Sequence, residues 1–120
     1  MTRSARRAVG GVAVLVVAGL VGTVVWWLGS DPRRGAEAVA ATEVVVTDDA
    51  FGPAVIEIGI GETVTWTFIG DDAHDVSGDG FVSPVMVEGT WEATFERPGT
   101  YDYVCSLHPV GMRGRVVVTP

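Results

Sequence analysis

The feature that most limits how this chain can fold is an uncharged, largely apolar run from Ala8 to Leu28, which is 21 residues long. A helix needs about 20 such residues to cross the hydrocarbon layer of a membrane. Arg3, Arg6 and Arg7 precede the run, as basic residues do in membrane anchors and in signal peptides. Both interpretations export the rest of the chain, which has room for one small domain.

The sequence leaves open whether this segment is retained. The run exceeds the apolar core of a signal peptide, and Trp26 and Trp27 stand where an interfacial aromatic belt would lie, so residues 1–28 are predicted to be a membrane anchor. Small-residue cleavage sites within Ala36–Ala41 favour a signal segment instead. We therefore predict a domain on the extracytoplasmic side, periplasmic or extracellular, which is held in the membrane through residues 8–28 or secreted if the segment is cleaved.

The remaining chain divides into a tether and a β-rich domain. Residues 29–41 are small, polar and interrupted by proline, which predicts a tether, and the folded domain is expected at residues 42–120. In that domain Val64, Trp66 and Phe68 alternate with threonines, the pattern of a half-buried strand. Turn residues separate six expected strands, at 43–47, 55–58, 63–69, 90–95, 101–104 and 115–119. The pattern predicts an all-β sandwich or barrel.

Charge and cysteine content narrow the function. From Ala36 onward fourteen acidic residues stand against three arginines, so nucleic acid is not expected as a partner. This acidity could serve solubility or steer a basic partner toward the domain. Cys105 is the only cysteine, so no intramolecular disulfide is available, and its thiol is either a metal ligand or a small buried core residue.

Four side chains form a candidate metal site. Cys105, His108 and Met112 lie within eight residues of one another, so a single loop can present all three. The only other histidine, His74, follows the expected strand at 63–69. Two histidines and a cysteine with a weak axial methionine are the donors of a blue copper centre, because thiolate and thioether suit Cu(I) and imidazole suits both oxidation states.

With these residues in place, the chain resembles the cupredoxins of the plastocyanin, amicyanin and halocyanin group, over about Glu43 to Val118. Supporting marks are Phe51-Gly52-Pro53, the stretch Gly61 to Trp66 before the first histidine, and the stretch Pro98 to Tyr103 before the cysteine. The resemblance implies a single cupredoxin-like Greek-key β-sandwich. It also implies one type 1 copper ion with the ligands His74, Cys105, His108 and Met112, and a monomeric one-electron carrier that is not an enzyme.

The resemblance also assigns two supporting features. Asp75 would take the place often held by an asparagine that ties the two ligand loops together near Ser106. Redox protein partners would dock near His108, on an apolar patch to which Pro109 and Val110 contribute.

The chain departs from the pattern of the family in two places. Three residues separate His108 from Met112, a spacing between those of amicyanin and plastocyanin, and Val104 replaces the aromatic residue that plastocyanins carry before the cysteine.

An exported copper-binding or copper-delivery protein is the alternative function. A Cys-His-His set can also bind zinc, although a methionine in the axial position favours copper. Two histidines are too few for a multicopper oxidase.

Overall fold

The computed structural model describes residues 31–120, so the anchor or signal segment expected at residues 1–28 lies outside the described residues. Within residues 31–120 there is no helix long and apolar enough to cross a membrane. The described part is built from ten β-strands. They are β1 (Val39–Ala40), β2 (Glu43–Val46), β3 (Phe51–Gly52), β4 (Val55–Gly59), β5 (Thr63–Phe68), β6 (Ser77–Gly78), β7 (Phe81–Val82), β8 (Gly89–Thr94), β9 (Gly99–Val104) and β10 (Arg113–Thr119).

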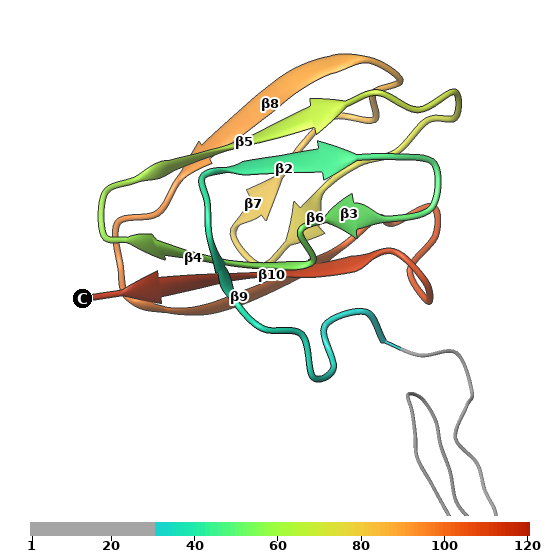
Figure 1. The fold of residues 1–120 in the computed structure, drawn as a ribbon. Helices are drawn as coiled ribbons and strands as arrows, with labels where there is room; N and C mark the ends of the chain where they lie inside the picture. Colours follow the sequence, from blue (N-terminus) through green and yellow to red (C-terminus); the bar gives the residue numbers. More distant parts are fainter. Residues whose placement is uncertain (1–30) are drawn as a thin grey trace, which may run out of the picture. The chain divides into compact units, whose positions relative to one another are not determined.

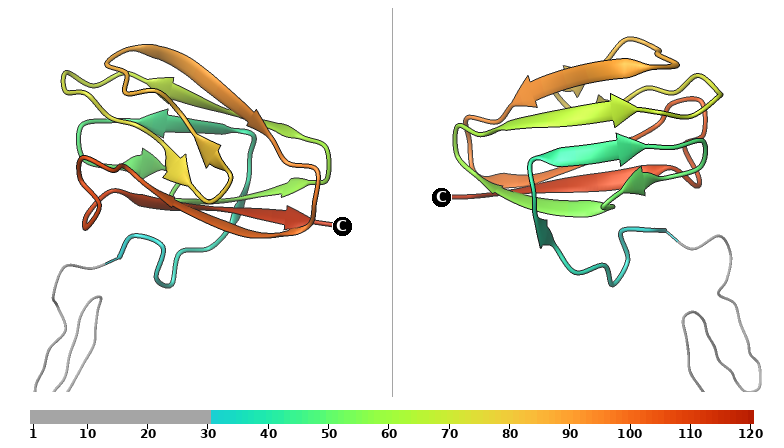
Figure 2. Two further views of the ribbon diagram at one scale, coloured as in Figure 1. Left: turned by 180° about the vertical axis from the view of Figure 1, so that it is seen from behind. Right: turned by 45° about the horizontal axis from the view of Figure 1, so that its top comes forward.

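These strands form two sheets that lie face to face (Figures 1 and 2). One sheet has six strands in the order β1-β4-β10-β9-β6-β7, and the other has four in the order β3-β2-β5-β8. The prediction of an all-β sandwich is confirmed, and each of the six expected strands overlaps an observed one. The first sheet mixes parallel pairs, such as β4 with β10, and antiparallel pairs, such as β9 with β10.

The core lies between the sheets and follows from the alternation seen in the sequence. On β5 the residues Val64, Trp66 and Phe68 are buried, and on β10 the buried residues include Val116 and Val118. A fully buried large apolar side chain contributes about 1.5–3 kcal/mol through the area removed from water. The opposite faces of these strands carry threonines and arginines, so the period of two residues decides which side chains enter the core.

Tyr103 of β9 packs against the opposite sheet at the centre of this core. Its ring meets that of Trp66 edge to face at 5.5 Å between centroids, and burial raises the pKa of the phenol. Gly114 lies opposite Tyr103 in the register of β9 and β10, and a Cβ at Gly114 would overlap the tyrosine ring. Glycine at this position therefore lets the backbone approach an aromatic side chain closely.

The described part of the expected tether, residues 31–41, packs on the domain, and we call it the linker segment. Its strand β1 pairs in parallel with β4, with Val39 opposite Ile56. Arg33 lies 3.4 Å from the Asp102 carboxylate of β9. Hydrogen bonds from the Arg33 side chain lower the pKa of Asp31 to about 2. Contacts with the domain thus begin before residue 42. The sequence did not predict them, because they depend on ion pairs and a two-residue strand that composition does not reveal.

Candidate metal centre

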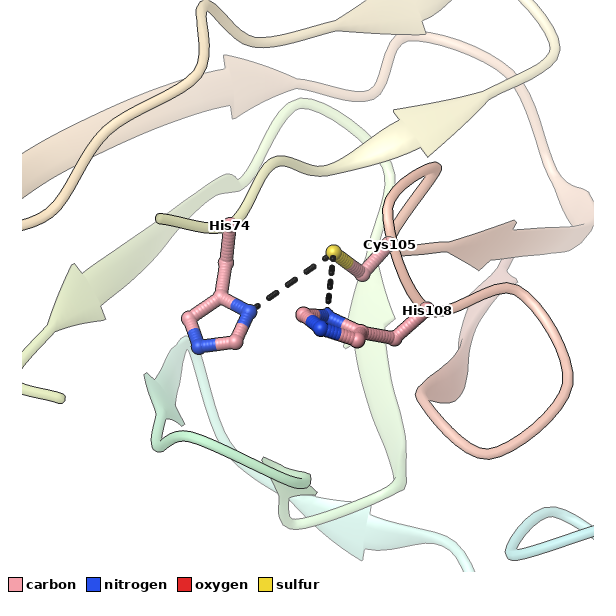
Figure 3. A group of neighbouring side chains, drawn as sticks. All are labelled: His74, Cys105 and His108. Atoms are coloured by element: carbon pink, nitrogen blue, oxygen red, sulfur yellow. Dashed lines mark hydrogen bonds between the residues drawn. The ribbon is translucent and has the colours of Figure 1, made fainter. Parts of the chain in front are cut away.

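Three of the four predicted ligands converge in the structure. The ligand atoms of His74, Cys105 and His108 all lie within 4.8 Å of one another. The Cys105 Sγ is 3.7 Å from the His74 Nδ1 and 3.6 Å from the His108 Nδ1, and Figure 3 shows both rings turning this nitrogen toward the sulfur. His74 and Cys105 are buried, whereas His108 is exposed.

The hairpin of β9 and β10 places the cysteine and the methionine. Cys105 directly follows β9 and Met112 directly precedes β10, and the two strands pair up to Val104 opposite Arg113. The Cys105 N–H donates to the Met112 carbonyl at 3.0 Å, so the two residues lie side by side. The Met112 N–H in turn donates to the His108 carbonyl at 3.0 Å. Met112 is buried, at 1% exposure, which places it in the interior beside Cys105.

His74 comes from the four-stranded sheet, in the loop that follows β5. Its backbone pairs with Met86, with the His74 N–H donating at 2.9 Å and its carbonyl accepting at 2.8 Å. The site therefore brings together donors from both sheets. This pairing also gives Met86 a backbone role, and Met86 is partly buried against the core.

Asp75 ties the two ligand loops together, as the resemblance implied. Its carboxylate accepts the Ser106 N–H at 2.7 Å and the Ser106 hydroxyl at 2.6 Å, and Asp75 is only 6% exposed. Because Asp75 follows His74 and Ser106 follows Cys105, these two bonds fix the backbones of two ligand residues relative to each other.

Sequence reasoning missed one neighbour of the site, Asp48. Its Oδ1 lies 3.4 Å from the His74 Nε2. The pKa of Asp48 lies below its ordinary value, chiefly because its carboxylate accepts the Asp72 N–H. Hydrogen bonds with His74 and with the Asp71 N–H lower this pKa further. Asp48 lies 26 residues before His74, in the loop after β2, and no spacing pattern links the two.

The donor chemistry fits a copper ion. The buried Cys105 thiol faces two imidazole nitrogens. The buried Met112 is hydrogen-bonded to Cys105 through the backbone. Soft sulfur donors combined with imidazole are the set that copper electron-transfer sites use. The surface next to His108 is apolar, because Leu107 and Val110 are 47% and 72% exposed.

The two-sheet fold and this donor set define a type 1 copper electron carrier. A family model described as a cupredoxin-like domain matches residues 20–118. The chain belongs to the cupredoxin family.

Curated relatives agree with this assignment. Amicyanin-alpha of Methylorubrum extorquens is 38% identical over 86 residues, which are 65% of this chain and 71% of the relative. Halocyanin of Natronomonas pharaonis is 41% identical over 91 residues, which are 68% of this chain and 56% of the relative. The chain thus spans little more than half of the halocyanin's length.

Solved structures share the fold. A purple cupredoxin from Nitrosopumilus maritimus has a TM-score of 0.60 at 27% identity, and the match covers 66% of this chain and 100% of the other. A reduced amicyanin variant has a TM-score of 0.57 at 32% identity, covering 69% of this chain and 86% of the other. Other similar amicyanin structures are described as a Cu(I) form and as an oxidized form.

Proposed function

We propose that His74, Cys105, His108 and Met112 are the copper ligands and that the protein passes single electrons between redox partners at the outer face of a membrane. The observation that carries this proposal is the convergence of the Cys105 thiol with the Nδ1 atoms of two histidines. Bound copper would supply a one-electron couple between Cu(I) and Cu(II).

The chain's own contribution is to hold the donors in place. The Asp75 carboxylate joins the two ligand loops, and the backbone bond between Cys105 and Met112 closes the hairpin. Because these bonds are formed by the protein alone, the donor positions depend little on the oxidation state of the site. A site that moves little during oxidation and reduction exchanges electrons rapidly, and rigid supporting contacts provide this.

Met112 is proposed as the fourth ligand, whose thioether would complete the donor set. Its burial and its backbone hydrogen bond with Cys105 support this role. The three residues between His108 and Met112 fold so that the Met112 N–H reaches the His108 carbonyl. This turn accommodates the intermediate spacing while keeping Met112 directly before β10.

Partners are proposed to dock around His108. This histidine is the one ligand of the converging group that is exposed, and Leu107 and Val110 add exposed apolar surface beside it. Exposed apolar patches of this kind mark interaction sites. A redox protein that covers this patch would bring its own cofactor close to the His108 ring, whose Nδ1 lies 3.6 Å from the buried Cys105 sulfur.

Residues 8–28 are proposed to be retained as a membrane anchor, with the monomeric domain on the extracytoplasmic side. Packing of the linker segment on the domain supports this, because cleavage within Ala36–Ala41 would remove Asp31 and Arg33, and an N-terminus at Ala41 would also remove β1. Mass spectrometry of the mature protein from membranes tests the proposal, and an N-terminus near Val39 or Ala41 would contradict it.

The visible absorption spectrum of the full chain in detergent, loaded with Cu(II), tests the copper site. We expect an intense orange-red band that a mild reductant bleaches, since it arises from the thiolate and Cu(II). The Cys105→Ser variant should lose the band, and Met86→Leu, a methionine outside the ligand set, should keep it. A pale spectrum with tight Cu(II) binding would refute electron transfer and favour copper delivery.

A further inference from the structure

The two nitrogens of the His74 ring have different neighbours. Nδ1 lies 3.7 Å from the Cys105 Sγ, on the side of the metal centre, and Nε2 lies 3.4 Å from the Asp48 Oδ1. His74 is 1% exposed, whereas the Asp48 side chain is 40% exposed, so a buried ring meets a carboxylate that also faces water. Asp48 belongs to the loop between β2 and β3, and therefore reaches the site from a third segment of the chain.

Backbone N–H groups and a glycine surround the Asp48 carboxylate. Its Oδ1 accepts the Asp71 N–H at 2.7 Å and the Asp72 N–H at 2.9 Å. A Cβ at Gly70 would overlap this oxygen and lie 3.1 Å from the Asp48 backbone nitrogen. The loop that carries His74 thus wraps around the carboxylate, and glycine at position 70 leaves the space for it.

The chemistry of this contact fixes the state of the ring. A neutral imidazole has one N–H, and an ionised carboxylate can only accept hydrogen bonds. In a neutral ring, donation to this carboxylate would hold the proton on Nε2 and leave the Nδ1 lone pair directed toward the Cys105 sulfur. Partners of this kind behind a metal-binding histidine set the tautomer, the ring orientation and the basicity of the ligand.

We propose that Asp48 is a positioning residue for the metal centre, whose carboxylate holds His74 in the tautomer and orientation that present Nδ1 to copper. This inference rests on the proposed role of His74 as a ligand. It assigns a function to a residue that neither the ligand motif nor the cysteine loop contains.

Three variants of the full chain in detergent separate the contact from the charge. Asp48→Ala removes the acceptor, and Asp48→Asn keeps an acceptor oxygen without the charge. Gly70→Ala displaces the carboxylate and leaves the net charge unchanged. Asp49→Ala is the matched control, because it removes one negative charge from the same loop, and the Asp49 carboxylate contacts Thr47 rather than His74.

The first measurement is nitrogen NMR of the metal-free protein at mildly alkaline pH, which reports the His74 tautomer. We expect the Nε2–H form in the unmodified chain, in Asp48→Asn and in Asp49→Ala, and a mixture of tautomers in Asp48→Ala and Gly70→Ala. The second is copper affinity by chelator competition, where loss of such a partner costs about 10–100-fold. Asp48→Ala and Gly70→Ala should show this loss, and the control should not.

The reduction potential provides a third readout that a purely structural role would not move. Asp48→Asn should raise the potential more than Asp49→Ala does, because the charge it removes lies against the ligand ring. Unchanged tautomer and affinity in both Asp48→Ala and Gly70→Ala would overturn the inference while the proposed function stood. If the unmodified chain bound no copper through Cys105, the proposed function itself would fail.

Discussion

Replacing Asp75 with alanine offers a direct test of how the two ligand loops are joined. The carboxylate is 6% exposed and accepts two hydrogen bonds from Ser106, at 2.7 Å from the backbone N–H and 2.6 Å from the hydroxyl. Asp75→Ala removes both acceptors at once. Ser106→Ala removes only the hydroxyl bond, and Asp75→Asn keeps one acceptor oxygen but loses the charge.

The expected magnitude follows from these contacts. Hydrogen bonds to a charged group contribute about 1.5–3 kcal/mol each. Ser106 is exposed, so its donors can bind water in the variant, and alanine no longer carries the cost of burying a charge. We therefore expect Asp75→Ala to lower the free energy of unfolding by about 2–3 kcal/mol in total, less than the sum of two bonds. Ser106→Ala and Asp75→Asn should each cost about 1 kcal/mol.

Thermal unfolding of the metal-free full chain, followed by circular dichroism under reducing conditions, measures these effects. Absence of metal matters because copper binding would add to the apparent stability. For a domain of this size 1 kcal/mol corresponds to roughly 4–8 °C, so Asp75→Ala should lower Tm by roughly 8–24 °C. A shift under about 2 °C would refute the reasoning. The double variant should show that the effects of Asp75 and Ser106 are not additive.

Two further predictions concern the core and the linker segment. Gly114→Ala places a methyl group against the Tyr103 ring, and overpacking should lower the free energy of unfolding by about 1–3 kcal/mol and lower Tm with it. Gly111→Ala, with open space around it, should leave Tm unchanged, and equal melting of the two variants would contradict this. Arg33 lowers the pKa of Asp31 from 3.8 to about 2, so the stability that Asp31 adds should be complete above about pH 4 and lost as the pH falls toward 2. Chemical denaturation of the unmodified chain and Asp31→Asn across this range measures it, and a constant difference down to pH 2 would rule it out.

The sequence predicted the parts of the molecule that depend on local pattern. Alternation in β5 correctly assigned Val64, Trp66 and Phe68 to the core. The spacing of Cys105 and His108 correctly placed them in one loop, because both lie within a single hairpin connection. His74 could be found because the chain has only two histidines and because the stretch Gly61 to Trp66 precedes it, whereas its approach to Cys105 depends on how two sheets pack.

What the sequence did not predict depends on contacts between distant segments. Asp48 looks like any acidic loop residue until the fold brings it against His74. Arg33 and Asp102 likewise lie far apart in the chain, and nothing in a short polar stretch signals that it will pack on a sheet. Hydrophobic period reports burial, whereas ion pairs and single hydrogen bonds leave no periodic trace.

Strand β1 has a consequence for the behaviour of the domain among other copies of itself. The outer edge of a sheet presents unpaired N–H and C=O groups, which can recruit a strand from another molecule. Beside β4 this edge is covered by the two residues Val39 and Ala40. A strand so short, followed by a turn of the chain, offers little to pair with. The linker segment therefore also protects the folded domain from edge-to-edge aggregation, and a shortened form without β1 would expose the longer edge of β4.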